Sequence, residues 1–173
     1  CICGEAMVQP EFVSDLFTRV KRLGLTTCLD TACHGNKGRW DKVLPYTDNV
    51  LLCLKGMDNE VAAQVAQVSP TAMAKSKEYA RYIRGAYPNI RITLCWVLLK
   101  DLTDTDTELE ALVGFARELG EVFHAIELIP YHELGRNKNT ALDLAHPLGD
   151  MGPYKPQDGE GDKERLEKKG LMV

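Results

Sequence analysis

The chain has 173 residues and a formal net charge of −4, with acidic and basic residues well mixed along it. This length suits one domain with a real hydrophobic core, and the mild charge argues against a nucleic-acid surface. No apolar run is long enough to cross a bilayer, and no signal-peptide pattern is present.

The six cysteines fall on or beside the predicted strands rather than in loops. This placement favours reduced thiols over a disulfide framework, and it predicts a cytoplasmic protein, or an organellar one if the source is eukaryotic. The chain does not begin with methionine, and residues 1–8 read as the end of a strand and its exit loop. We therefore expect a fragment or processed product whose N-terminal part is missing.

Helical patterns alternate with short apolar runs along the chain. Apolar residues at helical spacing predict helices at 10–24, near Val43, in two pieces within 60–87 that are separated at Ser69-Pro70, and at 104–119. Apolar, often β-branched runs predict strands at 25–31, 50–55, 90–99 and 124–130. The residues from 143 to 162 are rich in Gly, Pro and Asp, which predicts a long loop, and a short helix is expected at 163–169.

This order of elements defines an α/β fold. Near-continuous apolar strands are typical of parallel strands that are buried on both faces. No Gly-rich phosphate loop follows any strand, which argues against a dinucleotide-binding fold. A partial or open βα barrel at residues 1–142, followed by a loop-rich tail at 143–173, fits the pattern better.

Polar side chains follow several of the predicted strands. The strand at 124–130 is followed by Tyr131, His132, Glu133 and Arg136, and the other strand ends carry Gly4-Glu5, Asp30-Thr31 and Lys55. Because parallel strands share a direction, these ends meet at one edge of the barrel, where βα-barrel enzymes hold their active sites. The alternative for Asp30 and Lys55 is that they cap neighbouring helices or face solvent.

The motifs at these strand ends resemble those of the radical S-adenosylmethionine activating enzymes of glycyl-radical enzymes. The resemblance extends from residue 3 to about residue 140, and the block at 131–135 is its most specific part. It implies a partial (β/α)6 TIM-like barrel that holds a 4Fe-4S cluster and S-adenosylmethionine. Reductive cleavage of that cofactor yields a 5′-deoxyadenosyl radical, which abstracts hydrogen from a glycine of a partner such as pyruvate formate-lyase. The resemblance also implies flavodoxin or ferredoxin as electron donor, and a monomer.

The resemblance assigns cofactor contacts by position. Gly4 and Glu5 match the motif that contacts the methionine amino group, and Asp30 and Thr31 match a pair near the methionine carboxylate and a small cation. Physical chemistry agrees, because a zwitterion needs carboxylates for its ammonium and a cation for its carboxylate.

Two further contacts follow from the same resemblance. Lys55 matches the lysine that meets the methionine carboxylate, whereas Lys100 also follows a strand but begins a polar loop. His132 matches the histidine that packs near the adenosine.

The sequence departs from the family pattern at its cysteines. The CxxxCxxC motif that binds the cluster is absent, so we expect the cluster ligands and at least one N-terminal strand to lie outside this chain. Cysteines stand at positions 3, 33, 53 and 95, where the family has other residues. Either some of these thiols bind a metal or a relocated cluster, or they fill space left by polar residues.

Three functions remain open. The first is activation of a glycyl-radical enzyme. The second is a truncated or degenerate non-catalytic homologue that keeps the barrel and binds only the cofactor or the partner. The third is an unrelated barrel enzyme with His132 or Glu133 as general base, which would leave Asp30 and Lys55 without a role.

Overall fold

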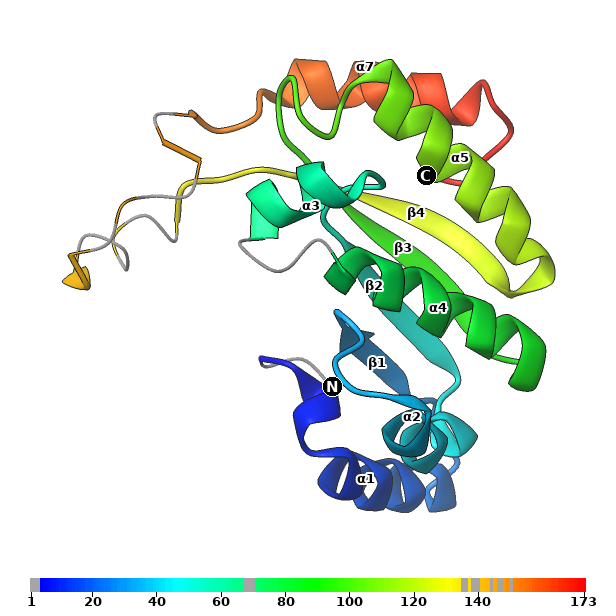
Figure 1. The fold of residues 1–173 in the computed structure, drawn as a ribbon. Helices are drawn as coiled ribbons and strands as arrows, with labels where there is room; N and C mark the ends of the chain where they lie inside the picture. The colour runs from blue at the N-terminus through cyan, green and yellow to red at the C-terminus, as the bar shows by residue number, and fades with distance from the viewer. Residues whose placement is uncertain are drawn as a thin grey trace.

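Four parallel strands form one open sheet in the order β1-β2-β3-β4 in the computed structural model (Figure 1). The structure describes residues 4–66, 71–134, 137, 141–143, 145, 148–149 and 151–173. The strands are β1 (Cys28–Thr31), β2 (Asn49–Leu54), β3 (Arg91–Leu98) and β4 (Phe123–Pro130). All four predicted strands are confirmed, and β1 begins later than expected because Thr27 bonds instead to the Tyr46 carbonyl and the Asp48 carboxylate.

Helices connect each strand to the next. They are α1 (Pro10–Arg22), α2 (Lys37–Val43), α3 (Asn59–Ala66), α4 (Thr71–Ala86), α5 (Asp106–Leu119) and α7 (Pro156–Glu167), with single 3-10 turns at Ala6–Val8, Leu44–Tyr46 and Gly120–Val122. Pro10 occupies the first turn of α1, the Thr105 hydroxyl caps α5 by accepting from the Glu108 N–H, and Gly120 ends α5 at a φ of 60°. The predicted break between the two helical pieces, at Ser69-Pro70, lies outside the described residues.

Only one face of the sheet is fully buried. Burial alternates along β1 and β2, and the buried residues of all four strands join those of α1, α2, α4 and α5 in one core. The opposite face, which we call the inner face, carries half-exposed residues such as Asp30, Leu51 and Cys53. The expectation of burial on both faces is therefore wrong for the described residues. Helices α1, α2, α4 and α5 pack on the buried face and leave the inner face partly exposed (Figure 1).

Helix α7 begins at Pro156 rather than at residue 163, so the predicted loop is wrong in its second half. Gly159 and Gly161 disfavour a helix by propensity, but tertiary contacts outweigh that cost. Gly159 lies against Leu98, with 3.7 Å from its would-be Cβ to Leu98 Cδ1, and Leu166 is fully buried.

A polar cluster and the backbone fix the C-terminal segment to the rest of the fold. The Tyr154 hydroxyl contacts the carboxylates of Asp104 and Asp162, and Arg165 pairs with Asp162. The carbonyl of Met172 accepts the Ile126 N–H at 2.8 Å, at the outer edge of β4. None of the helices among the described residues is both long and apolar enough to cross a membrane.

Asp48 links the start of β2 to α1 and to the segment before β1. Its carboxylate accepts bonds from Lys21 Nζ at 2.6 Å and from the Thr27 N–H at 2.7 Å. Partial burial opposes ionisation, but the bonds from Lys21 and Thr27 outweigh it and lower the pKa of Asp48 below its ordinary value. A depressed carboxyl pKa stabilises the fold above the unfolded-state value, and this stability is lost as the pH falls through the folded-state value.

We expect Asp48→Asn to lower the free energy of unfolding by about 1 kcal/mol near pH 7, because it weakens these bonds. The difference from the parent chain should shrink at acid pH, once the pH has fallen through the lowered pKa of Asp48, because a protonated carboxyl is uncharged like the amide. Urea unfolding at neutral and at acid pH measures it, with the exposed Asp15→Asn as control. A difference that is independent of pH would show that the ionised carboxylate is not the stabilising form.

Candidate functional site

The predicted site residues follow the carboxyl ends of three strands at one edge of the sheet. Gly4 and Glu5 lie beside the end of β1, Lys55 follows β2, and His132 follows β4. Figure 1 shows the N-terminal segment and the exits of these strands on the same side of the molecule. The structure thus brings together the ends that the sequence assigned to one edge.

Glu5 joins the N-terminal segment to the loop after β1. Its Oε1 accepts bonds from the Thr31 hydroxyl at 2.6 Å and the Met7 N–H at 2.9 Å, and its Oε2 accepts the Ala32 N–H at 2.8 Å. The Thr31 hydroxyl, which is almost fully buried, also accepts the Cys33 N–H. Both side chains therefore hold their own loops in place.

Gly4 lies directly before Glu5 and has a φ of +61°, in the left-handed region that favours glycine. A Cβ at this position would meet no atom of the described residues within 4 Å, apart from its chain neighbours. The glycine is therefore required by backbone conformation, and open space remains beside its backbone.

Lys55 is half-exposed and makes no hydrogen bond or ion pair with any residue that the structure describes. Alternation along β2 places it on the inner face with Leu51 and Cys53. The next residue, Gly56, is buried, and a Cβ there would lie 2.9 Å from the Ala62 backbone nitrogen. Only glycine fits where the loop passes this close to α3.

The loop after Lys55 is held from the outer side of the sheet. Glu108, which is 4% exposed, accepts the N–H groups of Met57 and Asp58 at 2.5 and 2.8 Å. Lys77 Nζ donates to the Met57 carbonyl at 2.7 Å. These bonds fix the backbone just after Lys55, so α4 and α5 hold in place the loop from which its side chain extends.

Four side chains cross the inner face in one row, which we call the thiol row: Asp30, Cys53, Cys95 and Glu127. Cys53 and Cys95 are register partners on β2 and β3, and Cys95 is in turn the partner of Glu127 on β4. The Cys53 thiol lies 3.4 Å from Asp30 Oδ1, and the Cys95 thiol lies 3.4 Å from Glu127 Oε2. Two carboxylates thus flank two adjacent thiols.

The pKa values of the two thiols in this row are shifted in opposite directions. A hydrogen bond from Cys95 lowers the pKa of Cys53, with a further contribution from the nearby Lys55 amine. The same bond, together with burial and the Glu127 carboxylate, raises the pKa of Cys95. Of the pair, Cys53 is therefore the thiol that ionises first.

The metal hypothesis for the four unexpected cysteines is not supported. Cys33 turns away from the inner face into the core, where its thiol contacts Ser76 Oγ and burial raises its pKa to about 11. Cys3 lies outside the described residues. Within the described part of the chain, no group of three or more His, Cys, Asp or Glu side chains could hold a metal ion.

His132 is exposed just beyond β4, and its Nδ1 accepts the Leu134 N–H at 3.4 Å. Tyr131 continues the pairing of β4, since its N–H donates to the Leu98 carbonyl. Gly135 and Arg136, at the end of the same motif, lie outside the described residues.

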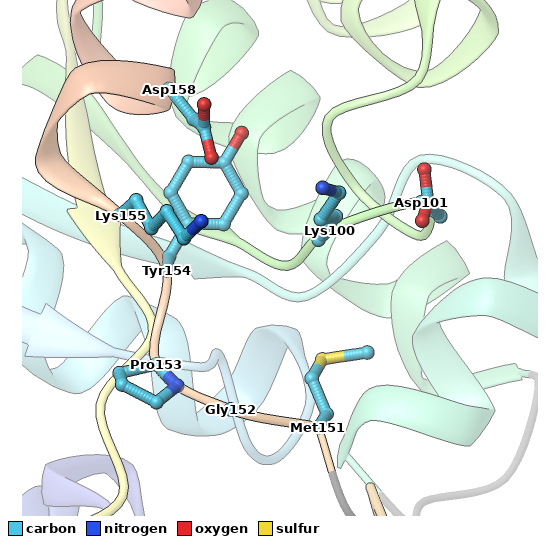
Figure 2. A pocket seen from close by; sticks show the side chains of 8 residues that line it. All are labelled: Lys100, Asp101, Met151, Gly152, Pro153, Tyr154, Lys155 and Asp158. Carbon is cyan, nitrogen blue, oxygen red and sulfur yellow. The ribbon is translucent and has the colours of Figure 1, made fainter.

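A hollow of about 300 Å³ lies at the end of β3, between Lys100-Asp101 and the segment 151–158. Figure 2 shows Lys100 between Tyr154 and Asp101, with Lys155 and Asp158 near the Tyr154 ring. None of the predicted site residues lines this hollow, and both of its lysines are exposed. We assign it no function.

The roles of two residues in this region were not predicted from the sequence. Glu127 interrupts the apolar run of β4, and this single polar residue was the available signal. Glu108 had no comparable signal, because an acidic residue in the first turn of a helix is explained by the helix dipole alone.

Comparisons with solved structures show the fold. A domain of pyruvate-formate lyase-activating enzyme from Bacteroides vulgatus ATCC 8482 matches with a TM-score of 0.76 at 20% identity, over 99% of this chain and 93% of that one. A radical SAM methyltransferase from Sphaerobacter thermophilus matches with a TM-score of 0.58 at 17% identity, over 87% of this chain and 40% of that one. The fold is therefore that of the radical S-adenosylmethionine enzymes.

Sequence comparison identifies the family. Pyruvate formate-lyase 1-activating enzyme of Escherichia coli K12 is 37% identical over 174 residues, which cover 98% of this chain and 68% of that enzyme. Pyruvate formate-lyase-activating enzyme of Clostridium pasteurianum is 31% identical over 150 residues, which cover 86% of this chain and 59% of that enzyme. No protein-family model matches the chain. The chain belongs to the family of glycyl-radical-enzyme activating enzymes, which use S-adenosylmethionine and a 4Fe-4S cluster.

Proposed function

We propose that this chain binds S-adenosylmethionine at the carboxyl edge of its sheet and serves the activation of a glycyl-radical enzyme, with pyruvate formate-lyase as the favoured partner. The observation that carries the proposal is the Lys55 amine, which lies on the inner face without a partner among the described residues. A half-exposed lysine with no counter-ion among the residues that the structure describes is suited to an anionic ligand.

The described residues fit the methionine end of the cofactor. Lys55 is the proposed partner of its carboxylate, and Asp30 is proposed to lie near the same carboxylate together with a small cation. The segment at Gly4 is proposed to contact its ammonium. The backbone at Gly4 has open space beside it. Glu5 and Thr31 act in this proposal by shaping the loop, because their side chains already bond to each other.

His132 is proposed to pack against the adenosine from the end of β4. Its exposure leaves the ring available, and an imidazole can stack on an adenine ring. This contact lies across the sheet edge from Lys55, so the cofactor would extend from β2 toward β4.

The described residues do not fit a 4Fe-4S cluster, because no three of their thiols converge. When bound in an enzyme of this family, the cluster and S-adenosylmethionine together supply the radical that takes hydrogen from the partner glycine. This chain contributes binding and orientation of the cofactor. A flavodoxin- or ferredoxin-type donor, a monomeric state and a cytoplasmic location belong to the same proposal.

A second candidate is a homologue that binds the cofactor or the partner without catalysis. One observation favours it: Cys53 and Cys95 lie side by side on the inner face, at positions where the resemblance implies other residues. The two candidates differ in radical formation and not in cofactor binding.

The test is glycyl-radical formation by the complete product of the gene that encodes this sequence. The protein is reconstituted anaerobically with iron and sulfide and is then mixed with a reductant, S-adenosylmethionine and pyruvate formate-lyase. We expect a glycyl-radical doublet by electron paramagnetic resonance that requires every component.

The two candidates give different results in this assay. Binding of S-adenosylmethionine without any radical would support the non-catalytic homologue. Absence of both binding and radical would exclude both proposals.

A further inference from the structure

We propose that Cys53 and Cys95 form a reversible disulfide across β2 and β3, which makes the thiol row a redox-sensitive site on the inner face. The proposal does not depend on the proposed function, because it concerns only the chemistry of these two side chains.

The register of the sheet places the two thiols within bonding range. Cys53 and Cys95 are direct partners in the parallel pairing of β2 with β3, and their side chains project from the same face. Neighbouring strands lie about 4.7–4.9 Å apart, and disulfides join residues whose Cα atoms are about 4.4–6.8 Å apart. The Cα spacing therefore suits a bridge, and because bridged cysteines have Cβ atoms about 3.5–4.5 Å apart, closing it requires rotation of the side chains and a small local approach of the two strands.

The other cysteines of the described chain lack this geometry. Cys28 pairs in register with Asn49 at the opposite end of the inner face, and Cys33 is buried against Ser76. Pairing within the described residues is therefore selective for Cys53 with Cys95.

Exposure and charge divide the roles of the two thiols. Cys53 is half-exposed on the inner face, and hydrogen bonding from Cys95 favours its thiolate. Cys95 is only 4% exposed, so a bulky oxidant cannot reach it directly. Cys53 is thus the attacking thiol and Cys95 the resolving thiol.

With glutathione disulfide as oxidant, the reaction balances. The Cys53 thiolate attacks one sulfur of the oxidant, forms a mixed disulfide and releases one glutathione thiolate. Cys95 then loses its proton and attacks the Cys53 sulfur, which releases the second glutathione. The two protein thiols lose two protons and two electrons, and the oxidant is reduced to two molecules of glutathione.

The bridge changes the inner face locally. In the reduced form the two thiols contact the carboxylates of Asp30 and Glu127. In the oxidised form neither sulfur carries a proton to donate. Asp30 and Glu127 would then lose their thiol donors, and the polarity of the row would change without unfolding of the sheet.

Peptide mapping tests the bridge on the purified chain. After incubation with glutathione disulfide and blocking of free thiols with N-ethylmaleimide, trypsin separates Cys53 in the peptide 43–55 from Cys95 in the peptide 92–100. We expect these two peptides to be linked, with the linked fraction rising with the ratio of oxidised to reduced glutathione and lost on reduction. Recovery of both peptides in the alkylated form, or of Cys53 as a stable glutathione adduct, would overturn the proposal.

Variants assign the two roles. Cys95→Ser should lose all linked peptide and leave Cys53 as the mixed disulfide with glutathione. Cys28→Ser, on the same face, should form the bridge as the parent chain does. If Cys95→Ser fails to fold, mapping of the parent chain and of Cys28→Ser still decides the question.

Discussion

Replacing Glu108 with alanine is expected to lower the free energy of unfolding by about 3–4 kcal/mol. The carboxylate is 4% exposed and accepts the N–H groups of Met57 and Asp58. Removing it leaves the buried Met57 N–H and the partly buried Asp58 N–H without their acceptor, and a donor left without its partner costs about 1–3 kcal/mol when it is buried. Urea unfolding monitored by circular dichroism measures the change.

Two further variants distinguish the loss of the hydrogen bonds to Met57 and Asp58 from a general effect on α5. Glu110→Ala lies on the same helix, but its carboxylate is exposed and pairs only with Lys169 at the surface, so it should change stability by less than about 0.5 kcal/mol. Glu108→Gln keeps one acceptor and should have an intermediate cost. Equal stabilities of the three variants would show that Glu108 does not hold the loop.

Replacing Lys55 with methionine is expected to weaken the binding of S-adenosylmethionine by roughly ten- to hundred-fold. Methionine retains much of the apolar stem and removes the charge. A charge-assisted hydrogen bond is worth about 1.5–3 kcal/mol, and each 1.4 kcal/mol corresponds to about tenfold in affinity. Isothermal titration calorimetry on the purified chain gives the two affinities directly.

Lys100→Met is the matched control for this experiment. Lys100 also follows a strand, but it is exposed at the end of β3 and lines a different hollow. Its replacement should leave the affinity unchanged. Equal losses for the two variants would point to a general charge effect, and no loss at Lys55 would remove this residue from the proposed site.

The strands were predictable because their apolar runs are bounded by clear helical patterns. The run at 90–99 contains only Arg91 and Thr93 as polar interruptions before Lys100, and it became β3. The start of α7 was not predictable, since Gly159 and Gly161 read as loop residues. Their helix is stabilised by packing against Leu98 and by the polar cluster around Tyr154, which are contacts between segments far apart in the sequence.

The site was predictable to the level of strand ends and no further. Lys55 and His132 could be placed at one edge because parallel strands share direction. The pairing of Cys53 with Cys95 depends on the register between β2 and β3, and a slip of one residue would put one thiol on the opposite face. The hydrogen bond from the Thr31 hydroxyl to the Glu5 carboxylate was not predictable either, because it depends on how the N-terminal segment meets the end of β1.

The bond between the Met172 carbonyl and the Ile126 N–H has a consequence for solubility. An unpaired strand edge is a template on which a second molecule can add a strand and begin an ordered aggregate. Here the chain's own last residues occupy that position on β4, beside α7. A protein cut after α7 would keep its sheet but expose this template, and its first defect would be self-association rather than unfolding.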